Sequence, residues 1–158
     1  MDPSWVAESD LGDLVYVLTM ARRRRNAFHR RPALSARLGV TVSTLSDWEA
    51  GRDAPTLLHL IRWALMFDLR LVICGEDGDY PLPELGDEAY EARRLLHALG
   101  DIRRGLSVTQ LRLSERLGVT ETTIHRWEHA LRHPRMLSLM RWAHELGCVI
   151  QLRSLNLS

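Results

Sequence analysis

One segment occurs twice in this chain, and this repeat limits the fold more than any other feature. Aligned with itself at an offset of 79 positions, the sequence from Leu34 to Ile73 pairs with the sequence from Leu113 to Leu152 without a gap, and 16 of the 40 pairs are identical. Solenoid units usually recur every ~20 to 50 residues and in several copies. Two copies at this longer period therefore indicate one small domain that has been duplicated.

The residues between the copies separate two such domains. The stretch GEDGDYPLPELGDEA, residues 75–89, is rich in glycine, proline and acidic residues and lacks sustained periodicity, which is typical of a connecting segment. We therefore predict a first domain at 1–74, a linker at 75–86 and a second domain at 87–158. A length of 158 residues and a hydrophobic content of 46% allow compact cores in two small domains.

Each copy begins with a pattern typical of a helix followed by a helix-turn-helix. Apolar residues at helical spacing predict the first helices at 10–25 and 87–104. In the second copy Gly118 stands where a left-handed residue would end the next helix, and Thr120 follows as the N-cap of a third helix. The first copy has the same residue types at the matching positions. Two short helices joined by a glycine-containing turn form a helix-turn-helix.

A fourth helix and a short strand complete each copy. Pro55 and Pro134 restart the chain after a short loop. The expected core faces of the fourth helices are Leu58, Ile61, Trp63 and Ala64 in the first copy and Leu137, Met140, Trp142 and Ala143 in the second. The runs LRLVIC at 69–74 and CVIQLR at 148–153 have strand character. Because an unpaired strand is costly, we expect these strands to pair with each other, as a small two-stranded sheet, or with the same strands of a second molecule.

The segment TQLRLSERLGVTETTIHRWE, Thr109 to Glu128, resembles the helix-turn-helix core of the phage-repressor-like regulators, the Cro/CI or XRE family. The family pattern has Ser/Thr-Gln, then Leu-Ala-Glu-Lys-Leu-Gly-Val-Ser, a variable patch and Ile-x-x-Trp/Ile-Glu, and the second copy follows it with Ser114 in place of the usual alanine. The resemblance covers about residues 10–74 and 87–153. It implies a mostly α fold of two tandem lambda-repressor-like helix-turn-helix domains, each ending in a short β-strand.

The resemblance also implies sequence-specific binding of double-stranded DNA, with the third helix of each copy in the major groove. A helix fits this groove, which is about 12 Å wide, and each base pair presents a distinct pattern of donors and acceptors there. Carried onto this sequence, the base-reading positions are Glu121, Thr122, His125 and Arg126 in the second copy and Val42, Ser43, Ser46 and Asp47 in the first. Phosphate contacts are implied for Gln110 and its counterpart Arg31, and the loop residues Arg52 and Arg132 are further candidates.

Other repeated residues are interpreted as structural. The family commonly buries an ion pair between an arginine late in its first helix and the glutamate of the Trp-Glu pair, and the resemblance places these pairs at Arg24–Glu49 and Arg103–Glu128. Removing one partner of a buried pair can cost about 3–5 kcal/mol, because the other charge is left unpaired. Four tryptophans at matching sites are interpreted as core anchors: Trp48, Trp63, Trp127 and Trp142.

The first copy departs from the family pattern at its DNA-binding surface. The stretch HRRPALSARLGV lacks the Ser/Thr-Gln, and the apolar Val42 and the acidic Asp47 would face an anionic groove. Two hypotheses stay open: both copies contact DNA, or the first copy is mainly a structural partner. The arginine-rich run at 21–31 has two interpretations as well, either binding of backbone phosphates or a solvated helix end whose cations interact with the helix dipole.

Composition and motifs argue against several other classes. The net charge is +1, so no overall field favours nucleic acid or an anionic membrane, and no apolar run approaches the ~20 residues that span a bilayer. His125, His129 and His133 recur every four residues, but Pro134 disrupts the third position, and we predict no metal site. No phosphate-binding glycine loop, nucleophile elbow or carboxylate pair indicates catalysis, so we expect neither enzyme activity nor a cofactor.

The sequence therefore predicts a cytoplasmic, nucleoid-associated transcription regulator that binds DNA with two recognition helices per chain, as a pseudo-dimer. Because the two reading surfaces differ, the target should be asymmetric and not a palindrome. A homodimer is a further candidate assembly and would present four recognition helices. Two alternatives stay open: a protein-interaction module that retains the fold, such as an antitoxin or an assembly factor, or a sequence-tolerant chromosome-organising protein.

Overall fold

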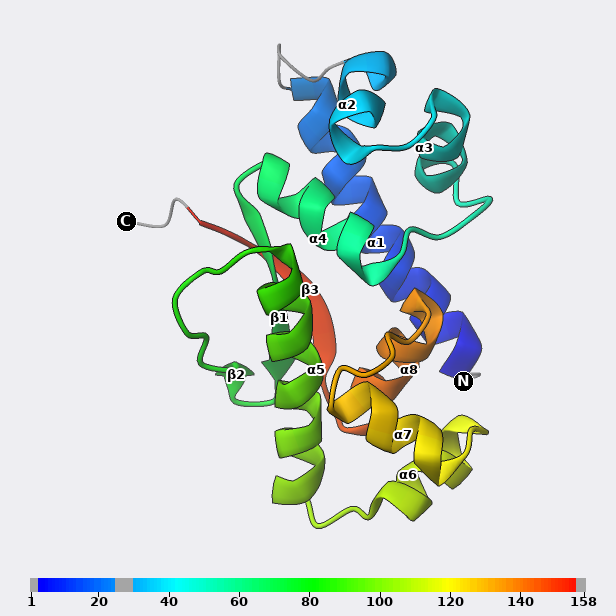
Figure 1. The fold of residues 1–158 in the computed structure, drawn as a ribbon, viewed down its shortest axis with the longest axis vertical. Helices are drawn as coiled ribbons and strands as arrows, with labels where there is room; N and C mark the ends of the chain where they lie inside the picture. Colours follow the sequence, from blue (N-terminus) through cyan, green and yellow to red (C-terminus); the bar gives the residue numbers. More distant parts are fainter. Residues whose placement is uncertain (1–2, 25–29, 156–158) are drawn as a thin grey trace.

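The computed structural model describes residues 3–24 and 30–155 (Figure 1). Its elements, in chain order, are α1 (Pro3–Arg24), α2 (Arg31–Leu38), α3 (Val42–Glu49), α4 (Leu57–Met66), β1 (Leu69–Gly75), β2 (Gly78–Asp79), α5 (Glu88–Gly105), α6 (Gln110–Leu117), α7 (Glu121–Glu128), α8 (Met136–Glu145) and β3 (Val149–Ser154). The fold is mostly helical, as predicted. The helices of the first repeat, α1 to α4, correspond one to one with α5 to α8 of the second.

Both helix-turn-helix motifs have the turn and the cap that the sequence predicts. Gly39 and Gly118 follow α2 and α6 with left-handed backbone angles, φ 74° and 70°, which glycine adopts without the steric cost of a Cβ. The hydroxyls of Thr41 and Thr120 then accept a hydrogen bond from the backbone N–H three residues further on. This N–H would otherwise lack a partner in the first turn of α3 or α7. Local sequence therefore determines where each third helix begins.

The buried faces of α4 and α8 begin one residue earlier than the apolar pattern predicts. Leu57 and its counterpart Met136 are 1% and 2% exposed, whereas Leu58 and Leu137 are 36% and 37% exposed. Each helix begins with the buried residue that follows its N-cap, so the apolar stripe recurs from that residue and the next one falls outside it. The prediction for Leu58 and Leu137 is therefore wrong. The other six predicted core residues of these helices are buried.

The four tryptophans interpreted as core anchors are buried and lie in two pairs. The ring centroids of Trp48 and Trp63 are 6.1 Å apart, and those of Trp127 and Trp142 are 5.9 Å apart. Each pair joins the third helix of a repeat to its fourth helix. The ring of His59 lies 5.3 Å from Trp48, and burial, together with the nearby Arg62 cation, lowers the pKa of His59. The protein environment therefore favours the neutral form of this imidazole.

The two repeat ends pair with each other, which confirms the predicted pairing. β1 and β3 run antiparallel, with Leu69 opposite Ser154 at one end and Cys74 opposite Val149 at the other. The sheet also contains β2, which lies in the predicted linker and pairs with the end of β1 in the order β2-β1-β3. The expectation of a two-stranded sheet is wrong in this respect. β2 is only two residues long and has no alternation of apolar and polar side chains that would mark it.

The register of β1 and β3 relates the two repeats by a pseudo-two-fold axis. Val72 lies opposite Gln151, which is its own equivalent 79 positions later. Leu71 lies opposite Leu152, the equivalent of Ile73. If a residue of the first repeat faces a given position of the second, the equivalent residues of the two repeats face each other in the opposite sense. The isologous interface of a symmetric dimer has the same property. One chain thus supplies both halves of a contact with the symmetry of a dimer interface.

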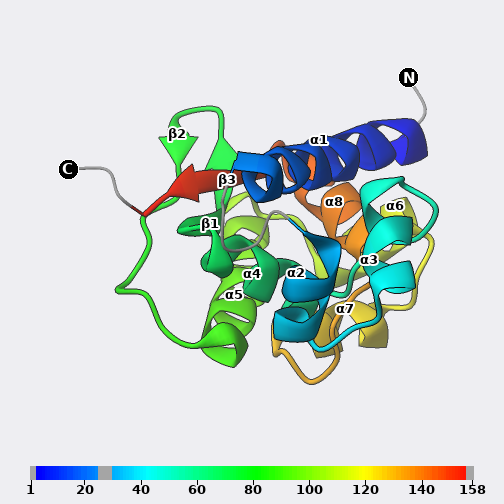
Figure 2. The ribbon, with the colours of Figure 1, turned by 90° about the horizontal axis from the view of Figure 1, so that it is seen from above.

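The first helix of each repeat packs onto the fourth helix of the other repeat. α1 packs along α8, and α5 packs along α4 (Figures 1 and 2). Two ion pairs accompany the second contact: Arg62 of α4 with Glu88 at 2.9 Å, and Arg70 of β1 with Glu91 at 2.6 Å. The buried apolar side chains of both repeats form a single cluster. The repeats therefore share one hydrophobic core, which sets the position of α3 relative to α7.

Candidate nucleic-acid interface

The third helices of the two repeats, α3 and α7, lie on the same side of the molecule (Figures 1 and 2). They are separated along its long axis, with α3 toward one end and α7 toward the other. The pseudo-two-fold axis between the repeats accounts for this arrangement. One extended partner surface can therefore meet both helices.

The outward face of α7 carries the four residues of the second repeat that the sequence predicts to read bases. Glu121, Thr122, His125 and Arg126 are all exposed. Their spacing along the helix places them on one face, while the opposite face of α7 is buried in the core. The side chains are thus presented together on a capped and packed helix.

The rings of His125, in the last turn of α7, and of His129, its C-cap residue, lie against each other at a tilt of 35°. The ring centroids of His125 and His129 are 4.2 Å apart. The Nδ1–H group of His129 donates to the backbone carbonyl oxygen of His125 at 2.9 Å, which leaves Nε2 of a neutral His129 as an acceptor. Within residues 3–24 and 30–155, no group of three or more histidine, cysteine or acidic side chains is arranged to hold a metal ion.

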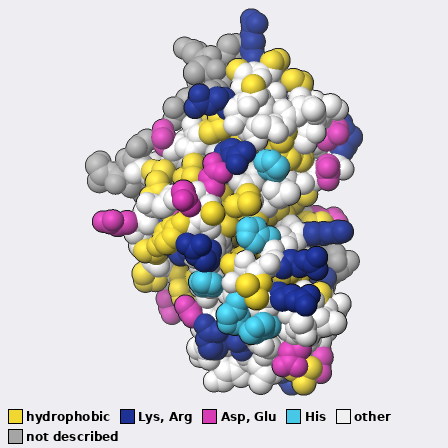
Figure 3. All heavy atoms as spheres, viewed as in Figure 1, with side chains coloured by type: hydrophobic (Ala, Val, Ile, Leu, Met, Phe, Trp, Pro, Cys, Tyr) yellow, Lys and Arg dark blue, Asp and Glu magenta, His cyan; other side chains and the backbone are white. Residues whose placement is uncertain are grey.

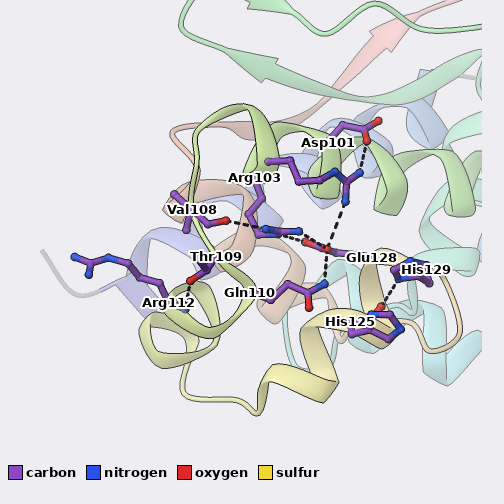
Figure 4. A network of polar contacts seen from close by, with 10 residues as sticks. Asp101, Arg103, Val108, Thr109, Gln110, Arg112, His125, Glu128 and His129 are labelled. Atoms are coloured by element: carbon purple, nitrogen blue, oxygen red, sulfur yellow. Dashed lines mark hydrogen bonds and ion pairs between the residues drawn. The ribbon is translucent and has the colours of Figure 1, made fainter.

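Glu128, the last residue of α7, anchors this helix to the rest of the second repeat (Figure 4). Its side chain is 1% exposed, and its carboxylate accepts hydrogen bonds from Nε and Nη2 of Arg103 at 2.5 and 3.0 Å. Arg103 also donates from Nη1 to the carbonyl oxygen of Val108 at 2.7 Å. These bonds join α5, the loop after it and α7. The predicted pair of Arg103 and Glu128 is confirmed.

In the first repeat the corresponding glutamate is paired with Arg22 and not with Arg24. Nε and Nη2 of Arg22 donate to the carboxylate of Glu49 at 2.7 and 3.1 Å, whereas Arg24 is exposed. The prediction for Arg24 is wrong because the repeats differ in length before the aligned block. Glu49 lies 27 positions after Arg22, but Glu128 lies only 25 positions after Arg103. The offset of 79 therefore does not extend to α1.

Gln110 and Arg31, the residues with implied phosphate contacts, hold these same glutamates from the starts of α6 and α2. Nε2 of Gln110 donates to Glu128 at 2.9 Å (Figure 4), and Nε of Arg31 donates to Glu49 at 2.7 Å. The side chain of Arg31 is 40% exposed. Each group has further N–H donors beyond the one engaged here. Both residues are thus part of the polar network that supports the third helices.

The outward face of α3 is less polar and less accessible than that of α7. Val42 and Ser43 are exposed, but Ser46 and Asp47 are only partly exposed. Nε of Arg52, in the loop after α3, donates to the carboxylate of Asp47 at 2.8 Å. Two residues that the sequence predicts to contact DNA are therefore bound to each other in the free protein.

Arginine and histidine side chains gather over α7 and the loop that follows it (Figure 3). Arg132 of this loop is exposed, and so is Arg135, the N-cap residue of α8. Arg135 is not among the DNA-binding residues predicted from the sequence, although a comparison of the two repeats could have identified it. Its counterpart Thr56 caps α4 with a side-chain hydroxyl, whereas Arg135 makes no such bond. Arg135 thus places a cation at a helix N-terminus, where phosphate groups bind readily.

The arginine-rich run at 21–31 is described only in part, since residues 25–29 lie outside the described residues. Arg22 and Arg31 bind Glu49. Arg23 and Arg24 are exposed in the last turn of α1, where cations complement the negative end of the helix dipole. Part of the run therefore has a structural role.

These motifs define the class of protein. The helix-turn-helix family model matches residues 22–73 and 99–150, which together are more than half of the chain and include both motifs. The chain therefore belongs to the XRE-type helix-turn-helix family, whose members are DNA-binding regulators.

Among individual proteins, the chain is similar to Antitoxin HigA1 of Mycobacterium tuberculosis, in the strains CDC 1551 / Oshkosh and ATCC 25618 / H37Rv. It is 32% identical to each over 66 residues, which are 42% of this chain and 44% of the relative. The match thus spans less than half the length of these relatives. No solved structure matches the chain significantly. None of the described helices is both long and apolar enough to cross a bilayer.

Proposed function

We propose that the chain is a sequence-specific transcription regulator that places α3 and α7 in the major groove of double-stranded DNA, with its two repeats acting as a pseudo-dimer. The observation that carries this proposal is the exposed polar face of α7, made by Glu121, Thr122, His125 and Arg126, on the same side of the molecule as α3. The units at 1–74 and 87–158, joined by the linker at 75–86, are its two halves. Family membership supports binding to DNA in general.

Arg126 is the principal base-reading residue in this proposal. Its planar guanidinium can donate to both O6 and N7 of guanine, and Glu121 can accept from the amino group of cytosine. Gln110 binds a phosphate with the N–H that Glu128 does not engage. Arg132 neutralises a further phosphate, which adds affinity without reading sequence.

The target is asymmetric, because the two reading faces differ in chemistry. Two recognition helices of a helix-turn-helix dimer meet half-sites about one turn of DNA apart, roughly 34 Å. In this chain one half-site meets Arg126 and Glu121, and the other meets Val42 and Asp47. The face of α7 therefore contributes most of the discrimination between sequences.

Selection of bound sites from a random duplex library tests the proposal directly. The expected result is one motif with two unlike halves, centred about 10 base pairs apart. A single half-site would show that only α7 engages DNA, and a perfect inverted repeat would show a homodimer that uses one repeat from each chain. Binding without a motif, with a steep salt dependence, would favour a sequence-tolerant protein. Each of these three results contradicts the pseudo-dimer.

Antitoxin activity is a second candidate, and the name of the two relatives, Antitoxin HigA1, favours it. In this case the chain binds a toxin protein, either together with DNA or in its place. A substitution on the exposed face of α7 can distinguish DNA binding from toxin binding. The Arg126→Ala variant should weaken specific binding to DNA if the chain binds DNA, and neutralisation of the toxin on co-expression should persist only if the toxin binds elsewhere on the chain.

The Asp47→Ala variant should bind the selected DNA site more tightly than the unmodified protein, by about tenfold. The substitution removes a negative charge from the face of α3 and releases Arg52 from its ion pair, so that Arg52 can approach a phosphate. Fluorescence anisotropy with a labelled duplex measures the change. Asp101→Ala is the matched control, since it removes an exposed carboxylate that pairs with Arg104 on α5. An equal response of both variants would place α3 away from the DNA.

A further inference from the structure

A cavity of about 630 Å³ opens between the two repeats next to α3. Its walls come from one face of α1, from the end of α3 and the loop after it, and from Leu137 of α8. The apolar part includes Leu11, Val15, Trp48 and Pro55. This size lies within the range of about 300–1,000 Å³ that is usual for small-molecule sites. The cavity is thus a candidate site to which both repeats contribute.

Gly12 lies at the centre of the cavity wall that α1 provides. The lining residues of α1 follow helical spacing, with Leu11 and Val15 near Gly12 and with Glu8 and Tyr16 one turn away on either side. Glycine weakens a helix interior, yet Gly12 is not among the residues with positive φ, and an added Cβ would meet no atom within 4 Å. Neither backbone conformation nor close packing requires a glycine here. Its effect on the structure is to leave the cavity open.

The second repeat has a larger side chain at the position that corresponds to Gly12. The pairing of Arg22 and Arg103 with equivalent glutamates aligns α1 with α5, so that Gly12 corresponds to Arg93 and Tyr16 to His97. The guanidinium of Arg93 lies over the ring of Tyr90, 5.8 Å from its centroid. The open space beside Gly12 is therefore a feature of the first repeat and not a consequence of the repeated fold.

The charges around the cavity favour a cation. Glu8 is exposed at the rim, and Asp53 accepts a hydrogen bond from the backbone N–H of Ala54. The other ionised groups of the lining are already paired within the protein, since Arg52 binds Asp47 and Glu49 binds Arg22 and Arg31. The aromatic rings of Trp48 and Tyr16 also attract cations through their faces. The geometry points to a binding site for a small apolar molecule with one positive charge, such as an aryl-alkyl amine, at Gly12.

Binding at this site would act on the DNA interface, and this part of the inference rests on the proposed function. The loop that lines the cavity follows directly after α3 and carries Arg52, which belongs to the first repeat. Leu137, on the opposite wall, belongs to α8 of the second repeat. A ligand in contact with both fixes the loop relative to α8. It therefore biases the spacing of α3 and α7, on which simultaneous contact with two half-sites depends.

Isothermal titration calorimetry on the full chain, without DNA, tests the site with three probes of nearly equal size: 4-phenylbutylamine, 4-phenylbutanol and 4-phenylbutyrate. We expect the amine to bind at least about tenfold more tightly than the carboxylate. The rim carboxylates attract the ammonium group and repel the carboxylate group, and the difference between these two interaction energies corresponds to this factor or more. The double variant Glu8→Gln, Asp53→Asn should reduce this preference to less than about threefold. Equal binding of amine and carboxylate to the unmodified protein, or no binding of any probe, would overturn the proposal.

Substitution of Gly12 locates the site. Gly12→Leu fills the cavity and should abolish amine binding, and Gly12→Ala should weaken it by a smaller factor. Both variants should unfold at a temperature no lower than that of the unmodified protein, since they replace a glycine inside a helix. Gly105→Leu is the control, because Gly105 of α5 also has no atom within 4 Å of an added Cβ. Unchanged amine binding by Gly12→Leu would exclude this cavity as the site, whatever the outcome of the DNA selection.

Discussion

Glu128→Ala should lower the free energy of unfolding by about 3–5 kcal/mol. The substitution leaves the guanidinium of Arg103 buried without its partner carboxylate, and it also removes the acceptor of Gln110. A domain of this size is stable by only about 5–15 kcal/mol in total. The variant should therefore be marginally folded, and urea denaturation followed by circular dichroism measures the loss.

Two comparisons show whether burial is the cause of this effect. Asp101→Ala removes a carboxylate that also pairs with an arginine of α5, but both groups are exposed, and such pairs contribute only about 0–1 kcal/mol. Glu49→Ala removes the equivalent of Glu128 from the first repeat, where one of the two partners, Arg31, is 40% exposed. We expect the loss in free energy of unfolding to be largest for Glu128→Ala, smaller for Glu49→Ala and smallest for Asp101→Ala. A loss below about 1 kcal/mol for Glu128→Ala would contradict the structural role of the pair.

Arg126→Ala should weaken binding to the selected DNA site by about 5- to 150-fold, equivalent to the roughly 1–3 kcal/mol of discrimination that one bidentate base contact provides. The residue is exposed and lies outside the core, so the stability of the protein should not change. The preference for one base pair of the motif should disappear in a repeated selection, while the other positions remain. Anisotropy titrations on specific and random duplexes measure both effects.

Arg132→Ala distinguishes base reading from a phosphate contact. This variant should bind all sequences more weakly by a similar factor, and the slope of log K against log salt should fall by about one. Arg93→Ala, on the exposed side of α5, should change neither quantity. If Arg126→Ala weakened binding to random and selected duplexes equally, Arg126 would be a phosphate contact and the assignment of α7 as the reading helix would fail.

Local sequence was sufficient to predict both helix-turn-helix motifs and the strand that ends each repeat, although α1 begins at Pro3 and not at Asp10. Gly118 and Thr120 specify the turn and the cap through interactions within a few residues, and the pairing of β1 with β3 follows from the cost of leaving two short strands unpaired. The family resemblance identified Arg103 and Glu128. It was less accurate for Arg24, because a difference of two residues in length outside the aligned block changes which arginine reaches Glu49.

The packing of the two repeats against each other could not be predicted from the sequence. Repeat alignment shows which helices are equivalent, but it does not show that α1 packs on α8 and α5 on α4, because each first helix has an apolar stripe that fits a fourth helix of either repeat. The ion pair of Asp47 with Arg52 depends on the path of a loop and has no equivalent in the second repeat, where Arg126 replaces Asp47. The cavity beside Gly12 likewise depends on contacts between the repeats.

The strand pair with Val72 opposite Gln151 also has a consequence for the amount of protein that a cell needs. When two separate chains build such an interface, the paired form dissociates on dilution. Here the partners are tethered, at an effective local concentration that is on the order of millimolar for a short linker. A few molecules per cell would therefore be fully assembled, and because both halves occupy one reading frame, a mutation can alter one half-site preference and leave the other intact.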